Sequence, residues 1–121
     1  MINTAILQKK KTMFCLVDAI MAGEGIGPLH PECKKAGILV AGFDPSIVDL
    51  VCAKIMGFDY RKIPSIANAF IIKELPITQY HPNEISIKSN LEKIEGYLEN
   101  ITFDKSWSFE PHFGWKGHIE L

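Results

Sequence analysis

The sequence predicts one α/β domain over residues 1–121, built from a mixed, largely parallel sheet flanked by helices, with an aromatic-rich β tail at its C-terminus. Two apolar runs, residues 12–22 and 36–42, do not alternate with polar residues. Continuous apolar strands are typical of a sheet that is covered on both faces. A capped helix follows the second run, and a hydrophobic content of 47% in a chain of this length is typical of a single globular domain.

The first segment, residues 2–11, is compatible with a short amphipathic helix in which Ile2, Ala5 and Ile6 form one apolar stripe. It ends in the lysine run of residues 9–11, the one basic cluster of the sequence. We interpret this run as a solvated helix end, because cations there oppose the negative end of the helix dipole. A phosphate-binding role for the run is the less favoured alternative.

The first apolar run ends in "GEGIGP", residues 23–28, because glycine takes backbone angles that other residues avoid. The backbone amides around Gly23, Glu24, Gly25 and Gly27 can cradle an anion such as a phosphate, with His30 beside them as a ligand or acid/base group. The spacing is neither a dinucleotide fingerprint nor a phosphate-binding P-loop. A tight structural turn is the alternative interpretation.

The stretch "FDPSIVDLVCAKIMG", residues 43–57, predicts a helix with clear ends. Asp44 is suited to cap the free amides of the first turn, and Pro45 suits the first helical position. Gly57 provides the stop. The apolar residues of this helix recur at helical spacing: Ile47, Val48, Val51, Cys52, Ile55 and Met56.

Further elements follow this helix. A second helix is predicted to begin near Pro64 and to end before Pro76. Residues 83–89 alternate like a half-buried strand, with Ile85 and Ile87 on one face, and residues 90–100 are helix-like.

The tail, residues 104–121, places Trp107 and Phe109 on one face of an alternating segment. Pro111 and Gly114 then permit a turn into a second extended piece, which completes the predicted β tail.

Two predicted strand ends carry acidic side chains. Asp18 lies near the end of the first strand and Asp44 at the end of the second, while Glu24 lies in the glycine stretch. If the strands are parallel neighbours, these three carboxylates meet at one sheet edge, with Asp49 one helical turn above. Crowded carboxylates repel one another unless a metal, a proton or a basic group joins them. Asp18, Glu24, Asp44 and Asp49 therefore predict a site for a divalent cation such as magnesium, although capping alone also explains Asp44.

Charge and cysteine usage exclude several classes of protein. A formal net charge of -1 provides no field for steering onto nucleic acid or an anionic membrane. Cys15, Cys33 and Cys52 form no paired motif, which argues against a zinc ribbon, an iron–sulfur cluster or a disulfide scaffold. Neither a signal peptide nor an apolar run of membrane length is evident, so the sequence predicts a cytoplasmic protein.

Two stretches read together resemble a known family. "LVDAIMAGEGIGP", residues 16–28, followed by "AGILVAGFDPSIVDLVCAKIMGFDYRKIP", residues 36–64, is similar to the C-terminal half of the domain of unknown function 362 family. The ending "FEPHFGWKGHIEL" is similar too, though less specific. Members are usually much longer, and many carry ferredoxin-like cysteine motifs that this sequence lacks. The resemblance implies a truncated member that needs a partner chain, and it implies no particular reaction and no cluster.

Two functions from different classes follow. The first is a ligand-binding domain whose glycine and carboxylate site takes a divalent cation, a small anionic ligand or both; whether it is an enzyme is left open. The alternative is a non-catalytic interaction or structural domain that assembles as a homo-oligomer or with a partner chain, through an exposed sheet edge or the aromatic tail. An electron-transfer accessory is a third possibility, suggested by the family resemblance alone.

Overall fold

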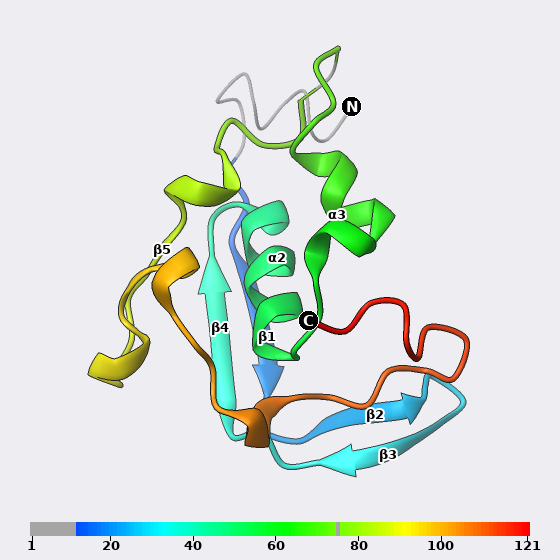
Figure 1. Ribbon diagram of the computed structural model, residues 1–121. Coiled ribbons are helices and arrows are strands. Elements are labelled where there is room, and N and C mark those ends of the chain that lie inside the picture. Colours follow the sequence, from blue (N-terminus) through cyan, green and yellow to red (C-terminus); the bar gives the residue numbers. More distant parts are fainter. Residues whose placement is uncertain (1–11, 75) are drawn as a thin grey trace.

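The computed structural model describes residues 12–74 and 76–121 (Figure 1). The predicted helix over residues 2–11 and its lysine run lie outside the described residues. The described part contains six strands, two α-helices and several short 3-10 turns. The strands are β1 (Cys15–Ala19), β2 (Ala22–Ile26), β3 (His30–Lys34), β4 (Ile38–Gly42), β5 (Ser86–Ile87) and β6 (Gly96–Tyr97), and the helices are α2 (Pro45–Ile55) and α3 (Pro64–Ala69).

The first four strands form one long, bent hairpin. β1 pairs antiparallel with β4, and β2 pairs antiparallel with β3. Two residues separate β1 from β2, whereas three separate β3 from β4, so one arm of the hairpin carries an extra residue at the junction. The extra residue is accommodated at Gly37, which has a φ of 69° and donates its amide to the Ile20 carbonyl at 3.2 Å. Such a bulge bends a ribbon, and Figure 1 shows the β2–β3 arm running across the foot of the β1–β4 pair.

The predicted mixed, largely parallel sheet is wrong: all three strand pairs in the described residues are antiparallel. Parallel neighbours need a crossover of a dozen or more residues, usually a helix. The residues between β1 and β4 instead fold back on themselves as β2 and β3, with the turn at residues 27–29. Residues 23–26 of the glycine stretch therefore belong to strand β2, and Gly27 and Pro28 lie in the turn.

Helix α2 begins and ends where the sequence predicts. The Asp44 carboxylate accepts hydrogen bonds from the amides of Ser46 at 2.9 Å and Ile47 at 3.3 Å, and Pro45 occupies the first position. Gly57 follows the helix with a φ of 80°, a backbone angle that favours glycine. Local capping chemistry therefore determines where this helix begins and ends.

Helix α3 begins at Pro64 as predicted but ends at Ala69, short of the predicted range. Ile71 and Ile72 follow its end, and β-branched residues lose side-chain freedom in a helix. The helix predicted over residues 90–100 is also wrong, because this segment consists of two 3-10 turns around the short strand β6. There, pairing with β5 replaces helix formation, and the Leu98 amide donates to the Ile85 carbonyl at 2.9 Å.

The predicted β tail is wrong as well. Residues 104–121 contain a 3-10 turn (Lys105–Trp107) and a single bridge between Glu120 and Phe58, but no strand. Trp107 and Phe109 are half-buried between exposed neighbours, but Trp107 packs against the cluster around Leu50 and Phe109 against the cluster around Phe58.

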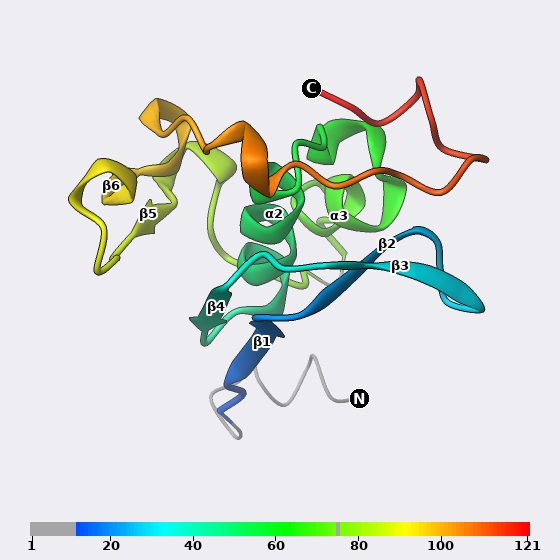
Figure 2. The same ribbon diagram turned by 90° about the horizontal axis from the view of Figure 1, so that it is seen from below.

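The core lies between α2 and the elements around it. Its main cluster consists of Leu50, Val51, Ile55, Ile85 and Leu98, and Ile38 and Val40 of β4 pack against it. A second cluster joins Ala53 and Phe58 to Ile119 near the C-terminus. Figure 2 shows α2 on one side of the β1–β4 pair, which gives this small sheet one covered face.

Candidate functional site

The four predicted metal ligands do not come together along the hairpin. Asp18 lies opposite Leu39 within the β1–β4 pair, whereas Asp44 lies beyond Gly42, which pairs with Cys15 at the other end of that sheet. The Asp18 carboxylate is exposed and accepts the Ile20 amide at 2.9 Å. Asp44 caps α2 and also accepts the Thr78 hydroxyl at 2.6 Å. Each carboxylate thus has a local structural role.

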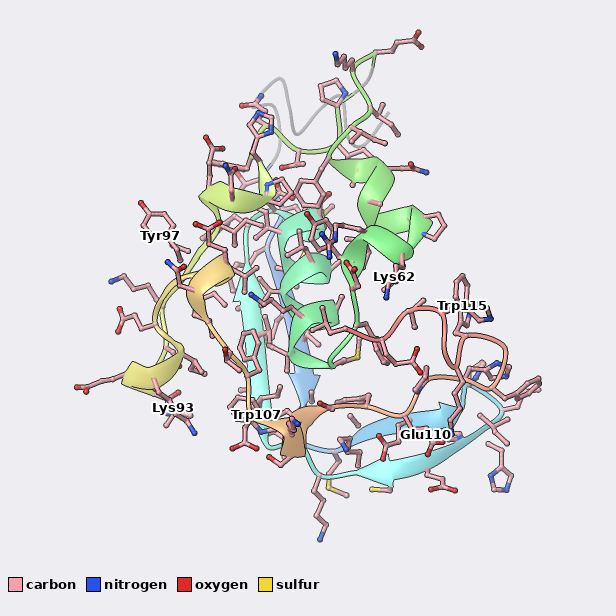
Figure 3. The ribbon with its side chains drawn as sticks, viewed as in Figure 1. Lys62, Lys93, Tyr97, Trp107, Glu110 and Trp115 are labelled. Carbon is pink, nitrogen blue, oxygen red and sulfur yellow. The ribbon has the colours of Figure 1, made fainter. Side chains whose placement is uncertain are left out.

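Glu24 fastens the C-terminal segment to the hairpin. Its carboxylate accepts the Glu110 amide at 2.8 Å and forms a salt bridge with Lys34 at 3.3 Å. The Gly25 amide returns a hydrogen bond to the Glu110 carbonyl at 2.9 Å. Figure 3 shows Glu110 over the β2–β3 arm, where these contacts form. A structural clamp therefore accounts for Glu24.

The predicted anion cradle is largely occupied by backbone contacts. The Gly25 amide bonds to Glu110, and the Gly27 amide donates to the Gly25 carbonyl at 2.9 Å. Gly23 lies against Pro31 across the hairpin, where an added Cβ would stand 2.8 Å from the proline Cβ. His30 is exposed in β3, opposite Ile26. These glycines serve close strand packing and the hairpin turn.

Asp49 lies on the exposed side of α2. Partial burial raises the pKa of its carboxyl above the usual value. Burial, and then the charge of Asp49, raise the pKa of the Cys52 thiol. No group of three or more His, Cys, Asp or Glu side chains in residues 12–74 and 76–121 is placed to hold a metal. The parallel strands on which the metal site was predicted are absent from this part, and cation binding itself stays a prediction.

The structure instead reveals an apolar face on the β1–β4 sheet. Alternate residues of the two strands point away from α2, and the large side chains among them are between 52% and 68% exposed. They are Phe14, Leu16, Ile20, Leu39 and Phe43, and we call them, with Ala41 and Asp18, the outer face. The rings of Phe14 and Phe43 meet edge-on at 5.1 Å between centroids. Asp18 is the one charged residue of this face.

The outer face follows from the same apolar runs that predicted two-sided burial. Val17 and Val40 are cross-strand partners on the inner face, and Leu16 and Ala41 are partners on the outer face. α2 covers only the inner side, and the two strands form a sheet of their own in the described residues. The apolar runs predict burial of both faces, and within residues 12–74 and 76–121 only the inner face packs against the core.

Comparisons with known proteins find a similarity that covers part of this chain. No family model matches this chain, and no solved structure matches it. The chain is 32% identical over 78 residues to the thylakoid-associated protein sll1697 of Synechocystis sp., a match that covers 60% of this chain and 24% of that protein. In the residues that the structure describes, no helix is long and apolar enough to cross a membrane. The chain thus spans about a quarter of the length of the relative it matches, and the resemblance to the domain of unknown function 362 family stays a prediction.

Proposed function

We propose that this chain is a non-catalytic interaction domain that forms a homodimer through the outer face of the β1–β4 sheet. The observation that supports the proposal is the outer face itself, where five large apolar side chains are each more than half exposed. Contiguous apolar surface of this kind marks interaction sites in soluble proteins. The three free cysteines agree with a reducing compartment, and we place the protein in the cytoplasm.

The size of the outer face fits a second copy of the chain. Side chains of this kind, each leaving about 100 Å² uncovered, offer on the order of 500 Å² of apolar surface together. A standard interface buries about 800 Å² on each partner, so the outer face and its rim account for most of one side. A two-fold axis would bring the same patch of both copies together, and each copy would then bury the apolar face of the other. Two sheets packed face to face would then share one core.

The test is the oligomeric state over a dilution series, followed by sedimentation velocity. We expect a dimer with a dissociation constant in the micromolar range or tighter. Leu16→Glu and Leu39→Glu each place a charge on the outer face and should weaken the dimer at least about tenfold, because the charge loses water on association. Leu29→Glu is the matched control, since Leu29 is 94% exposed in the hairpin turn. It should leave association unchanged.

Two results would overturn the proposal. One is a monomer at every concentration up to the solubility limit. The other is a dimer that responds to Leu29→Glu as strongly as to Leu16→Glu and Leu39→Glu, because the contact would then lie elsewhere.

A further inference from the structure

The free edge of β4 opens into a groove of about 780 Å³ on the α2 side of the sheet. Residues 38–44 form one wall, and residues 86–91 form the other. Ile47, Val51 and Ile55 of α2 line its floor, with Trp107 among the remaining lining residues. Figure 1 shows the segment around β5 beside β4, on the side away from β1. The groove lies on the α2 side of the sheet, and it shares Ile20, Leu39, Ala41 and Phe43 with the outer face.

The backbone of β4 defines what this groove can bind. Among the described residues, β4 is hydrogen-bonded as a strand to β1 alone. In an antiparallel strand, alternate N–H and C=O groups point to opposite edges, so those at the groove edge lack a ladder partner in the part of the chain that the structure describes. An extended polypeptide offers donors and acceptors at the matching spacing. The edge therefore favours a strand over a compact ligand.

Charge and space narrow the occupant further. Asp44 and Lys88 are the charged residues of the lining, and both have partners: Asp44 caps α2, and Lys88 pairs with Glu95 at 2.8 Å. The groove therefore offers no unpaired charge to a ligand. β4 has five residues, about 17 Å of strand, which sets the length of a segment that can pair with it.

We propose that this groove binds an extended, uncharged polypeptide segment, which adds to β4 as a third strand of the β1–β4 sheet. Alternate side chains of the segment fill the apolar floor against Ile47, Val51 and Trp107. The other side chains extend the outer face. A five-residue contact buries less area than a standard interface, so the affinity is micromolar rather than nanomolar. The inference differs from the homodimer, because it uses the backbone edge of β4 and the floor formed by α2, whereas the homodimer uses the outer face, which includes Phe14 and Leu16.

The experiment selects displayed random peptides of about nine residues on the full chain, a length that spans β4 with flanks. Enriched sequences are synthesised and titrated with Trp107 fluorescence in a Trp115→Phe background. We expect apolar residues at alternate positions, micromolar binding, and slower deuterium exchange of the β4 amides. The double variant Ser86→Phe with Asn90→Phe fills the groove from two exposed positions and should weaken binding at least about tenfold.

Leu16→Glu separates this inference from the proposed dimer. Leu16 belongs to the outer face but is not among the residues that line the groove, so the variant should leave peptide affinity within about twofold even where it abolishes the dimer. Three results would overturn the inference: no enriched sequence, bound peptides that leave exchange at residues 38–42 unchanged, or equal binding by the filled variant. A dimer that is lost only when the groove is filled would assign the groove to a second copy, and would overturn it as well.

Discussion

The two faces of the β1–β4 sheet consist of the same kind of residues but differ in how far they are buried. On the inner face, Ile38 and Val40 pack against the core beneath α2. On the outer face, Leu16, Leu39 and Phe43 are between 59% and 68% exposed. The two faces do not differ in residue type. They differ in whether α2 packs on them. An apolar strand pattern therefore predicts that a surface is to be buried, without saying which polypeptide buries it.

The largest effect should come from truncating the core beneath the inner face. Leu50 is 2% exposed, so Leu50→Ala should lower the free energy of unfolding by about 2–5 kcal/mol, through lost burial and the cavity left behind. Leu16→Ala on the outer face should cost less than about 0.5 kcal/mol in the monomer, because Leu16 has little to lose on truncation. Urea unfolding at a protein concentration below the dissociation constant measures both. Equal costs would mean that Leu16 is covered in the monomer.

The contrast also explains what the sequence could predict. The ends of α2 rest on neighbours in the chain, namely the Asp44 carboxylate, Pro45 and Gly57, and these were predicted correctly. The direction of β4 relative to β1 depends on how residues 20–37 are folded. The sequence predicts a glycine loop followed by a long connection in this segment, but the segment forms a hairpin whose register sets Gly25 against Pro31. Strand pairing between distant residues leaves no comparable local mark.

The predicted meeting of the carboxylates depends on the same strand direction. Asp18, Glu24 and Asp44 converge only if the two strands run parallel, and in the antiparallel hairpin each carboxylate has its own backbone amides to accept. The outer face does not follow from the sequence, because a continuous apolar run predicts burial of both faces without showing which polypeptide covers each of them. Alternation in exposure along β1 and β4 becomes visible only when α2 is known to cover one side.

A second prediction compares Asp44, the carboxylate that caps α2, with Asp18 on the outer face. Asp44→Ala should destabilise the protein by about 0.5–2 kcal/mol, because the first turn of α2 loses its cap. Asp44→Asn should cost little, since asparagine caps about as well. Asp18→Ala should cost less than Asp44→Ala, because the Ile20 amide that Asp18 accepts is exposed to water. Thermal unfolding of the three variants gives the order, and a larger loss at Asp18 would contradict it.

A third, smaller effect concerns the stability of the protein at acid pH, through the buried residue Asp59. Hydrogen bonds from the Arg61 guanidinium, at 2.8 Å to each carboxylate oxygen, hold the pKa of Asp59 below its usual value. A folded-state pKa below that of the unfolded chain means stability that is present above the unfolded value near 3.8 and lost as pH falls through the folded one. Asp59→Asn should flatten the dependence of stability on pH below about 4. Because Arg61 is 72% exposed, solvent screens the pair and keeps the effect modest.

Urea unfolding at several pH values from neutral down to about 3 measures this dependence. Glu110→Gln is the control: its partner Lys116 also lowers the pKa of the Glu110 carboxyl, but both side chains are more than half exposed. If Glu110→Gln flattened the dependence of stability on pH as much as Asp59→Asn, burial of Asp59 would not account for the effect.

The smallest effect, on the outer face, distinguishes an interface from a ligand site. Asp18 is the charged residue of that face, and dimerisation would remove water from its carboxylate, which opposes association. Asp18→Asn keeps a carbonyl oxygen for the Ile20 amide but removes the charge, so the dimer should tighten by about two- to fivefold with little change in monomer stability. Sedimentation at low concentration measures the change. If Asp18 instead holds a cation, magnesium should raise the melting temperature of the wild type and not of Asp18→Asn, while the dissociation constant of the dimer stays the same. A dimer weakened by Asp18→Asn would contradict both expectations, because the carboxylate would then pair with a donor on the second copy.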